Sequence, residues 1–228
     1  MNRSNPSGPP LTAADLQETY ARRFAGQETR RTKVWEVLCQ HFFQRWVRPE
    51  DAVLDLGAGY CEFINSFRAN QKFALDLNPA TALHAANNVT VLSQDVAKTW
   101  DLPPSSLDVV FTSNFLEHLE NKQSLVHCLR EAARLLRPGG RFIALGPNIR
   151  YAYKVYWDYF DHYLPLSDKS LVEALETNGF KAEVVIPRFL PFTMKGNTPS
   201  HPLLVRLYLM MSITWRVFGR QFLIVASK

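Results

Sequence analysis

The stretch Ala52-Val53-Leu54-Asp55-Leu56-Gly57-Ala58-Gly59-Tyr60-Cys61 decides the fold. Its first five residues are nearly all apolar, which predicts a short buried strand over Ala52–Leu56. A Gly-x-Gly turn follows the strand, and because glycine has no Cβ, a ligand can lie against the main chain there. A helix that begins after such a turn points its N-terminal amide groups at the same place. The stretch therefore predicts a strand, a turn and a helix that together bind a nucleotide.

Strands and helices alternate on both sides of this unit. The pattern predicts helices over Leu11–Gln44, over Lys122–Arg137 up to the stop at Pro138-Gly139-Gly140, and over Ser167–Asn178 before Gly179. It predicts further strands over Lys72–Leu77, Val89–Leu92, Leu107–Ser113, Arg141–Gly146, Ala182–Ile186 and Phe222–Ala226. Such alternation implies crossover connections and a mainly parallel sheet with helices on both faces. The fold class is therefore α/β, with a doubly wound, Rossmann-like sheet.

The composition is that of a globular protein, with 46% hydrophobic and 21% charged residues in 228. Residues 1–12 are rich in polar residues and proline, so we expect a disordered tail followed by a single domain over 13–228. The sequence contains no signal peptide and no apolar stretch of bilayer length, which favours the cytoplasm. Cys39, Cys61 and Cys128 are scattered, as free thiols are, and predict no metal site.

The net charge of +5 is unevenly placed along the chain. Residues 181–228 carry seven basic residues and one acidic residue, whereas residues 1–180 have a net charge of −1. The basic C-terminal region could attract an anionic substrate or a membrane surface, or could be a solvated face.

Polar groups recur where the predicted strands end. Asp76 lies 19 residues after Gly57, at the distance from which a carboxylate accepts hydrogen bonds from ribose hydroxyls. Asp95 follows the third strand and Asn114 follows the fourth. Because ligands bind at the carboxyl ends of strands in open α/β sheets, we expect these side chains to surround one site.

The ligand could be a dinucleotide or a nucleoside without phosphates. Glu62 occupies the position of the third glycine in Gly-x-Gly-x-x-Gly, and a carboxylate there would repel a pyrophosphate. A nucleoside has no such conflict, and one that carries a cation would be favoured by Asp55 and Glu62. The sequence therefore favours the nucleoside.

In this order the motifs resemble those of class I S-adenosylmethionine-dependent methyltransferases of the bacterial type 11 group. The matching segments are Val53–Gly59, Ala74–Leu77, Asp95-Val96, Leu107–Leu119 and Leu136–Gly140. The resemblance implies a seven-stranded sheet whose last strand is antiparallel to the rest. It also implies N-terminal helices over 13–46, a cofactor-binding core over 50–148, and substrate-side insertions over 149–166 and 189–219. Tyr60-Cys61 departs from the family, which often has a further glycine there.

The resemblance assigns the cofactor site residue by residue. Gly57 and Gly59 would let the backbone approach the methionine part and the ribose, and Asp55 would support the turn or bind the amino group. Asp76 would hold the ribose hydroxyls. The remaining contacts would be Leu77, Asp95 and Val96 with adenine, and Asn114 with the methionine part.

Methyl transfer to oxygen benefits from a base, and His118 is one candidate, at the cleft end of the fourth strand beside Glu117. The alternative is that both residues only orient the following loop. An aromatic cluster over Tyr151–His162 offers a second set of candidates. His162 and Asp161 could remove a proton, while Tyr151, Trp157 and Asp158 could bind the acceptor; the alternative is a packed aromatic helix.

The segment Phe189–Gly219 interrupts the last two strands. Its apolar part could cover the substrate cleft or, with the arginines over 203–220, contact a membrane or a lipid-linked substrate. The basic residues are not grouped in a motif that recognises nucleic acid, so we expect the protein not to bind nucleic acid. The sequence leaves the oligomeric state open.

We therefore expect a methyltransferase that uses S-adenosylmethionine on a small-molecule, glycan or lipid-linked acceptor, with oxygen favoured as the methylated atom. One alternative is a nicotinamide-dependent oxidoreductase or epimerase. The other is a subunit that binds S-adenosylmethionine without catalysis.

Overall fold

The computed structural model describes residues 13–192 and 201–228, so the predicted tail over 1–12 lies outside the described residues. The chain begins with helices α1 (Ala13–Phe24) and α2 (Glu28–His41), followed by the 3₁₀ turn η1 (Phe43–Trp46). They occupy the region of the predicted N-terminal helices.

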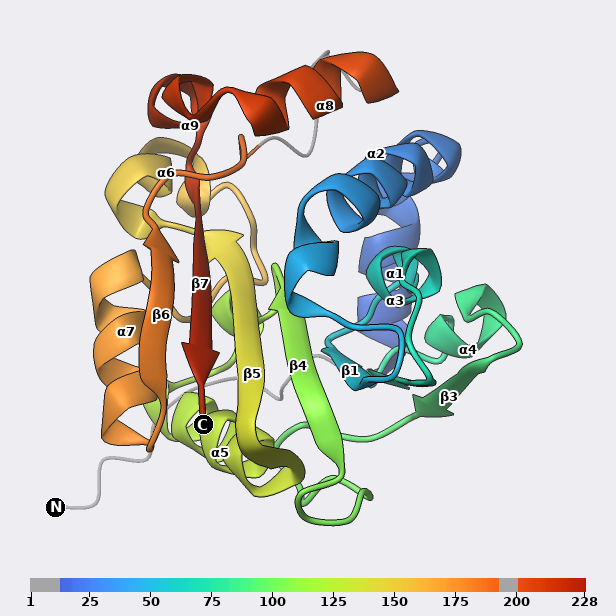
Figure 1. Ribbon diagram of the computed structural model, residues 1–228. Coiled ribbons are helices and arrows are strands. Elements are labelled where there is room, and N and C mark those ends of the chain that lie inside the picture. Colours follow the sequence, from blue (N-terminus) through green and yellow to red (C-terminus); the bar gives the residue numbers. More distant parts are fainter. Residues whose placement is uncertain (1–12, 193–200) are drawn as a thin grey trace, which may run out of the picture.

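Seven strands form one sheet with the order β3-β2-β1-β4-β5-β7-β6 (Figure 1). Their bounds are β1 Ala52–Leu56, β2 Gln71–Leu75, β3 Val89–Leu92, β4 Leu107–Ser113, β5 Leu136–Pro147, β6 Lys181–Ile186 and β7 Gln221–Ser227. Strand β7 runs antiparallel to both β5 and β6, and the other pairs are parallel. The predicted doubly wound sheet with an antiparallel last strand is confirmed.

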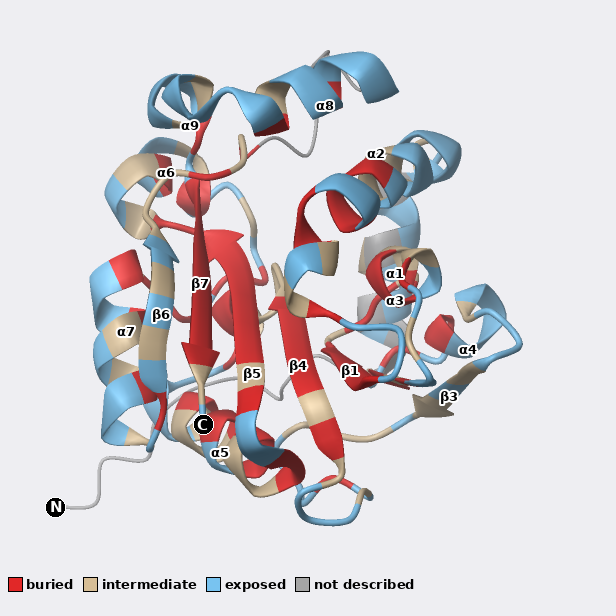
Figure 2. Cartoon of the chain, in the orientation of Figure 1, coloured by how far each residue is buried: buried red, intermediate tan, exposed pale blue. Residues whose placement is uncertain are grey.

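Helices cover both faces of the sheet, because successive side chains of a strand point to opposite faces. Leu54 of β1 belongs to a core that includes α5 (Lys122–Leu135) and α7 (Asp168–Thr177). Its neighbour Val53 belongs to the opposite core, built with α2 and α3 (Glu62–Ser66). The strands are accordingly buried along most of their length, whereas the outer sides of the helices are exposed (Figure 2).

Three predicted boundaries were wrong, all for local reasons. The helix predicted to Arg137 ends at Leu135, because Leu136 is extended and already pairs with Leu107 of β4. Strand β2 ends at Leu75 instead of residue 77, since the carboxylate of Asp76 accepts a hydrogen bond from the amide of Asn78 and starts a turn. The strand predicted from Arg141 was wrong for the same reason as the helix end, since β5 begins at Leu136 and runs to Pro147. The remaining strand predictions agree with the structure to within one residue.

Short helices and loops gather at the carboxyl ends of the parallel strands. They are α4 (Thr81–His84), η2 (Leu116–His118), α6 (Ile149–Tyr156), α8 (Pro202–Met210) and α9 (Ser212–Phe218). Helices α8 and α9 cross above the ends of β5 and β6 (Figure 1). In the part of the chain that the structure describes, no helix is both long and apolar enough to cross a membrane.

Candidate active site

The glycine turn after β1 is held by a backbone hydrogen bond and is packed so closely that position 57 has no room for a side chain. Gly57 has φ +72°, and a Cβ there would lie 2.3 Å from the ring of Phe115. Its amide donates to the carbonyl of Leu75, at 2.9 Å. Gly59 also has a positive φ, of 52°. Gly57 is therefore required by the close approach of the Phe115 ring as well as by its positive φ.

Cys61 takes the place where the family often has a further glycine. It adopts a left-handed conformation with φ 61°, at the N-cap of α3. Its buried thiol lies 3.7 Å from the carbonyl of Thr81. The departure from the family therefore changes the side chain and keeps the left-handed shape that a glycine provides.

Asp76 is tied directly to this turn. Its carboxylate accepts hydrogen bonds from the amides of Gly59 at 2.7 Å and Asn78 at 2.8 Å. Burial raises the pKa of Asp76, although these amides oppose the rise. The carboxylate thus fixes the turn and still has lone pairs for a ligand.

Asp55 lies beneath the turn with 3% of its surface exposed. Burial raises the pKa of Asp55 well above its ordinary value, and the charges of Glu62 and Asp76 add to the rise, against a hydrogen bond from the backbone of Ile64. Glu62 is in turn paired with Arg31, at 2.6 Å. Asp55 therefore links the end of β1 to the first turn of α3.

Asn114 follows β4 with φ 49°, and its amide donates to the carbonyl of Leu145, at 2.9 Å. The side-chain nitrogen contacts the hydroxyl of Ser113, but the buried Oδ1 has no hydrogen-bond partner within residues 13–192 and 201–228. A buried acceptor without a partner is uncommon and fits a donor on a ligand.

A cavity of about 780 Å³ opens beside these residues. Asp55, Gly57, Gly59 and Asn114 form part of its lining at one end. Helices α2 and α8 and the segment around Leu190 supply mostly apolar walls. Four arginines also line it: Arg23, Arg30, Arg31 and Arg220.

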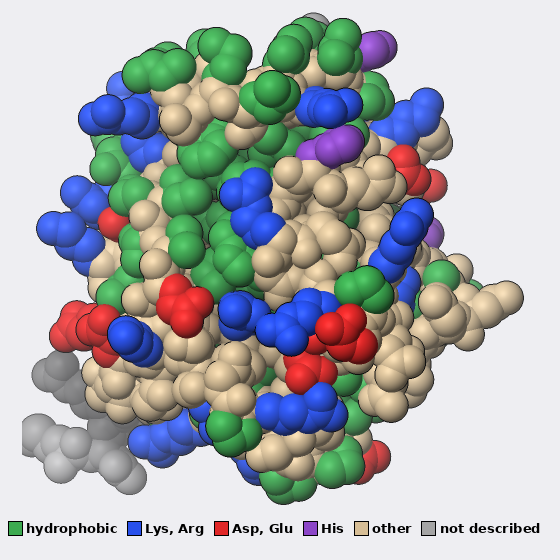
Figure 3. Space-filling model, viewed as in Figure 1, with side chains coloured by type: hydrophobic (Ala, Val, Ile, Leu, Met, Phe, Trp, Pro, Cys, Tyr) green, Lys and Arg blue, Asp and Glu red, His purple; other side chains and the backbone are tan. Residues whose placement is uncertain are grey.

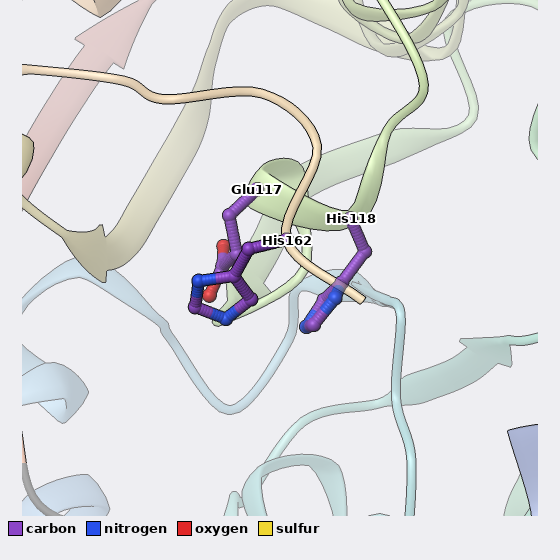
Figure 4. Close-up of side chains that lie close together, drawn as sticks. All are labelled: Glu117, His118 and His162. Carbon is purple, nitrogen blue, oxygen red and sulfur yellow. The ribbon is translucent and has the colours of Figure 1, made fainter. Parts of the chain in front are cut away.

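Glu117, His118 and His162 lie together at the cavity wall (Figure 4). With Asp161, which faces His118 from behind the wall, they form a polar cluster. The carbonyl of Glu117 accepts from the amides of Tyr163 and Leu164, which brings residues 161 and 162 onto η2. The Nδ1 atom of His118 lies 2.7 Å from the carbonyl oxygen of Asp161 and 3.4 Å from its carboxylate. The rings of the two histidines meet edge to face with centroids 5.0 Å apart.

Burial and charge set the protonation of this polar cluster. Burial raises the pKa of Glu117 to about 7, although the nearby His118 opposes the rise. Burial lowers the pKa of His162 to about 4, and the charge of His118 lowers it further. For Asp161, burial is outweighed by a hydrogen bond from Arg23 and by His118, so its pKa is lowered. At neutral pH the cluster therefore contains a charged Asp161 and a neutral His162.

The other residues that the sequence predicted for the site fall into two groups. Asp76, Leu77, Asp95 and Val96 follow the ends of β2 and β3 and lie outside the described lining of the cavity. Leu77 is 40% exposed, so a flat ring such as adenine could pack against it.

The predicted acceptor residues on α6 and after it lie elsewhere. Tyr151, Trp157 and Asp158 are outside the described lining of the cavity, and Trp157 is 59% exposed. Tyr151 packs under the guanidinium of Arg188, 4.9 Å from its ring centroid. An amphipathic helix buries one side, and here the buried residues are Ala152 and Tyr156.

Sequence reasoning missed most of the apolar wall and the arginines of the N-terminal helices. Arg23 reaches Asp161 across 138 residues of sequence, at 2.6 Å. No short-range pattern signals such a contact. Glu117 was noted only as a neighbour of His118, although its burial at 3% exposure marks it as unusual for a carboxylate.

Comparison with known families agrees with this arrangement. Residues 54–144 match the family model described as a methyltransferase domain. The chain carries a methyltransferase domain. The family implies S-adenosylmethionine as the cofactor. The match favours a methyltransferase over the nicotinamide-dependent alternative. Among curated protein sequences, none matches the chain significantly.

Solved structures show the same fold. A methyltransferase from Haloferax volcanii, solved in complex with the Trm112 methyltransferase activator, is 20% identical, with a TM-score of 0.69 over 95% of this chain and 97% of that one. An S-adenosylmethionine-dependent methyltransferase from Archaeoglobus fulgidus is 18% identical, with a TM-score of 0.65 over 92% and 98%. One from Thermotoga maritima is 18% identical, with a TM-score of 0.62 over 92% and 99%. The methyltransferase domain therefore has the class I fold.

Proposed function

We propose that the protein transfers a methyl group from S-adenosylmethionine to a hydroxyl oxygen of a glycan or lipid-linked acceptor. The observation that carries the proposal is the cavity, which joins the glycine turn at Gly57 to the polar cluster at His118 and His162. Between them its walls are mostly apolar, which suits an amphiphilic acceptor. The arginines at its edge suit an anionic group on that acceptor.

The described residues fit the cofactor. S-adenosylmethionine supplies a methyl group on a sulfonium sulfur, already activated for displacement by a nucleophile. We place the cofactor against the backbone of Gly57 and Gly59, both of which line the cavity, and the unpaired Oδ1 of Asn114 can accept from an ammonium group. We assign the ribose hydroxyls to Asp76 and the adenine to Leu77, Asp95 and Val96, with Asp55 supporting the turn from below.

We assign the acceptor hydroxyl to the polar cluster. A hydroxyl becomes a better nucleophile as it loses its proton, and His118 and His162 lie where that proton would leave. Asp161 positions His118, since its carbonyl and carboxylate both face Nδ1 of the ring. This leaves the Nε2 side of His118 for the cavity. Tyr151, Trp157 and Asp158 are not among the described residues that line the cavity, so we do not assign the acceptor to them.

The test uses S-adenosylmethionine with a labelled methyl group and a panel of acceptors. The panel contains sugars, phenols, polyprenyl-linked sugars and amines, and the product linkage is read by mass spectrometry. We expect label in methyl ethers and none with Asp76→Ala. Label confined to amines would overturn the oxygen assignment, and cofactor binding without any transfer would favour a non-catalytic subunit.

A second proposal concerns the outer surface of α8 and α9, which we infer rests on an anionic membrane. Eight large apolar side chains there are 44–73% exposed: Leu203, Leu204, Leu207, Met210, Met211, Ile213, Val217 and Phe218. Figure 3 shows apolar side chains gathered along this edge of the molecule. The exposed Arg206, Arg216 and Arg220 stand among them. Apolar residues flanked by arginine suit an interface of lipid headgroups and acyl chains.

This surface adjoins the cavity, because Leu204, Val217 and Phe218 also line it. A lipid-linked acceptor could thus reach the cavity from the bilayer.

Vesicle sedimentation tests the membrane contact. Vesicles containing phosphatidylglycerol should bind the protein more strongly than vesicles of phosphatidylcholine alone. Leu207→Glu combined with Met210→Glu should remove most of the binding. Leu83→Glu is the matched control, since Leu83 is 81% exposed but lies on α4. Equal loss with the control variant, or equal binding to both vesicle types, would overturn the proposal.

A further inference from the structure

The polar cluster contains two buried atoms that the fold does not satisfy. Glu117 is 3% exposed and His162 is 6% exposed. In the described ranges 13–192 and 201–228, neither Oε1 of Glu117 nor Nδ1 of His162 has a hydrogen-bond partner. Leaving a buried polar atom unpaired costs about 1–3 kcal/mol. Two such atoms in one cluster suggest that a bound group normally satisfies them.

The geometry of the cluster is that of a cation site. Glu117, His118 and His162 each offer one ligand atom, and these three atoms lie within 4.8 Å of one another. The three side chains converge from η2 and from the loop after α6 (Figure 4). Small rotations of the side chains would bring the atoms to the spacing of ligands that share one ion.

The surroundings of His118 also match those of a metal ligand. A histidine that binds a metal through one ring nitrogen usually donates the other N–H to a carbonyl or carboxylate, which fixes its orientation. The Nδ1 atom of His118 faces both the carbonyl oxygen of Asp161, at 2.7 Å, and its carboxylate. Arg23 holds that carboxylate from the far side, at 2.6 Å. This arrangement leaves Nε2 to bind a cation.

We propose that Glu117, His118 and His162 bind a divalent transition-metal cation at the wall of the cavity. Two imidazoles and one carboxylate suit zinc, iron or manganese better than magnesium or calcium, which prefer oxygen ligands alone. The cysteine pattern of the sequence could not signal this site, because its ligands are histidine and glutamate. Cys39, Cys61 and Cys128 are buried, and burial raises the pKa of each thiol.

The role of the cation rests on the proposed function. A hydroxyl that reaches the cation would have a lower pKa, and its proton would pass to solvent. His118 would then act as a ligand in place of a base, and His162 would be a ligand as well. A cation at this place gives the buried carboxylate of Glu117 a partner, which the base role of His118 does not.

Isothermal titration with Zn²⁺ or Mn²⁺ of metal-stripped protein tests the site. We expect one cation per chain, and about 100-fold weaker binding for Glu117→Gln, His118→Ala and His162→Ala. His127→Ala is the matched control, because His127 lies half-buried on α5, away from the polar cluster, and contacts the carbonyl of Lys98. It should bind the cation as the natural chain does. A Co²⁺-loaded sample should show an absorption spectrum without thiolate charge transfer.

Two outcomes would overturn the site: failure of the natural chain to bind at millimolar cation, or equal weakening by His127→Ala. A second measurement separates this inference from the proposed function. If the protein binds the cofactor, S-adenosylhomocysteine should raise its melting temperature. All four variants should keep that rise, which also shows that they fold. If S-adenosylhomocysteine does not raise the melting temperature of the natural chain but the cation still binds, the proposed function is contradicted and the cation site is not.

Discussion

The cofactor end and the acceptor end of the cavity are built in different ways. The cofactor end is made from a continuous stretch of chain, Asp55–Gly59, which Asp76 holds from outside the cavity lining by accepting a hydrogen bond from the amide of Gly59. The acceptor end brings together Arg23, η2 and residues 161–162, which are far apart in sequence. The first end depends on backbone shape and the second on side chains that tertiary pairing brings together. We therefore expect substitutions at one end to leave the shape of the other unchanged, although the charge of His118 reaches Asp76 and lowers its pKa.

The largest expected effect comes from Gly57→Ala, at the cofactor end. The new Cβ would collide with the ring of Phe115, at 2.3 Å, and the residue must keep φ +72°. We expect a loss of about 3 kcal/mol in the free energy of unfolding and no binding of S-adenosylhomocysteine.

Gly26→Ala is the matched control for this change. Gly26 has nearly the same φ, +71°, but no described heavy atom lies within 4 Å of its ideal Cβ. It should lose about 1 kcal/mol and bind normally. Urea unfolding and calorimetry measure both quantities. If the two variants behave alike, the close approach of Phe115 does not shape the turn.

The same contrast shows how much could be predicted from the sequence. The strands and the glycine turn follow from local periodicity and from Gly57, so the fold class was predictable, while the antiparallel last strand followed from the family resemblance. The wall containing Arg23 and Glu117 was not, because the contact between Arg23 and Asp161 depends on how α1 packs against the finished domain. Trp157 and Asp158 show the complementary limit, since an aromatic pattern does not reveal which side of a short helix faces a cavity.

A smaller effect is expected when Asp55 becomes Asn, which tests the buried charge at the cofactor end. The pKa of Asp55 is raised in the folded protein, so the folded state holds its proton more tightly than the unfolded state. Its contribution to stability is therefore present below about pH 4 and is lost as the pH rises through the folded pKa. Between pH 5 and pH 9, the melting temperature of the natural chain should fall more steeply than that of Asp55→Asn. If scanning calorimetry gives the same dependence of melting temperature on pH for both proteins, the ionisation of Asp55 does not lower the stability of the folded state.

The smallest effect is expected for Trp157→Ala, at a residue that the sequence assigned to the acceptor. Trp157 is 59% exposed and lies outside the described lining, whereas Phe218 is 60% exposed and lines the cavity. Trp157→Ala should leave the acceptor KM unchanged and alter stability by less than about 0.5 kcal/mol. Phe218→Ala should raise the KM about fivefold, equal to about 1 kcal/mol. Steady-state kinetics on a soluble acceptor decides, and a larger effect at Trp157 would move the acceptor end to α6.

Calorimetric titration with S-adenosylhomocysteine tests the separation of the two ends most directly. Asp76→Ala should abolish binding, since Asp76 fixes the turn at Gly59 and is assigned to the ribose. His162→Ala should bind the ligand as tightly as the natural chain, because His162 lies at the acceptor end. Binding that survives in Asp76→Ala, or disappears in His162→Ala, would contradict the division of the cavity into a cofactor end and an acceptor end.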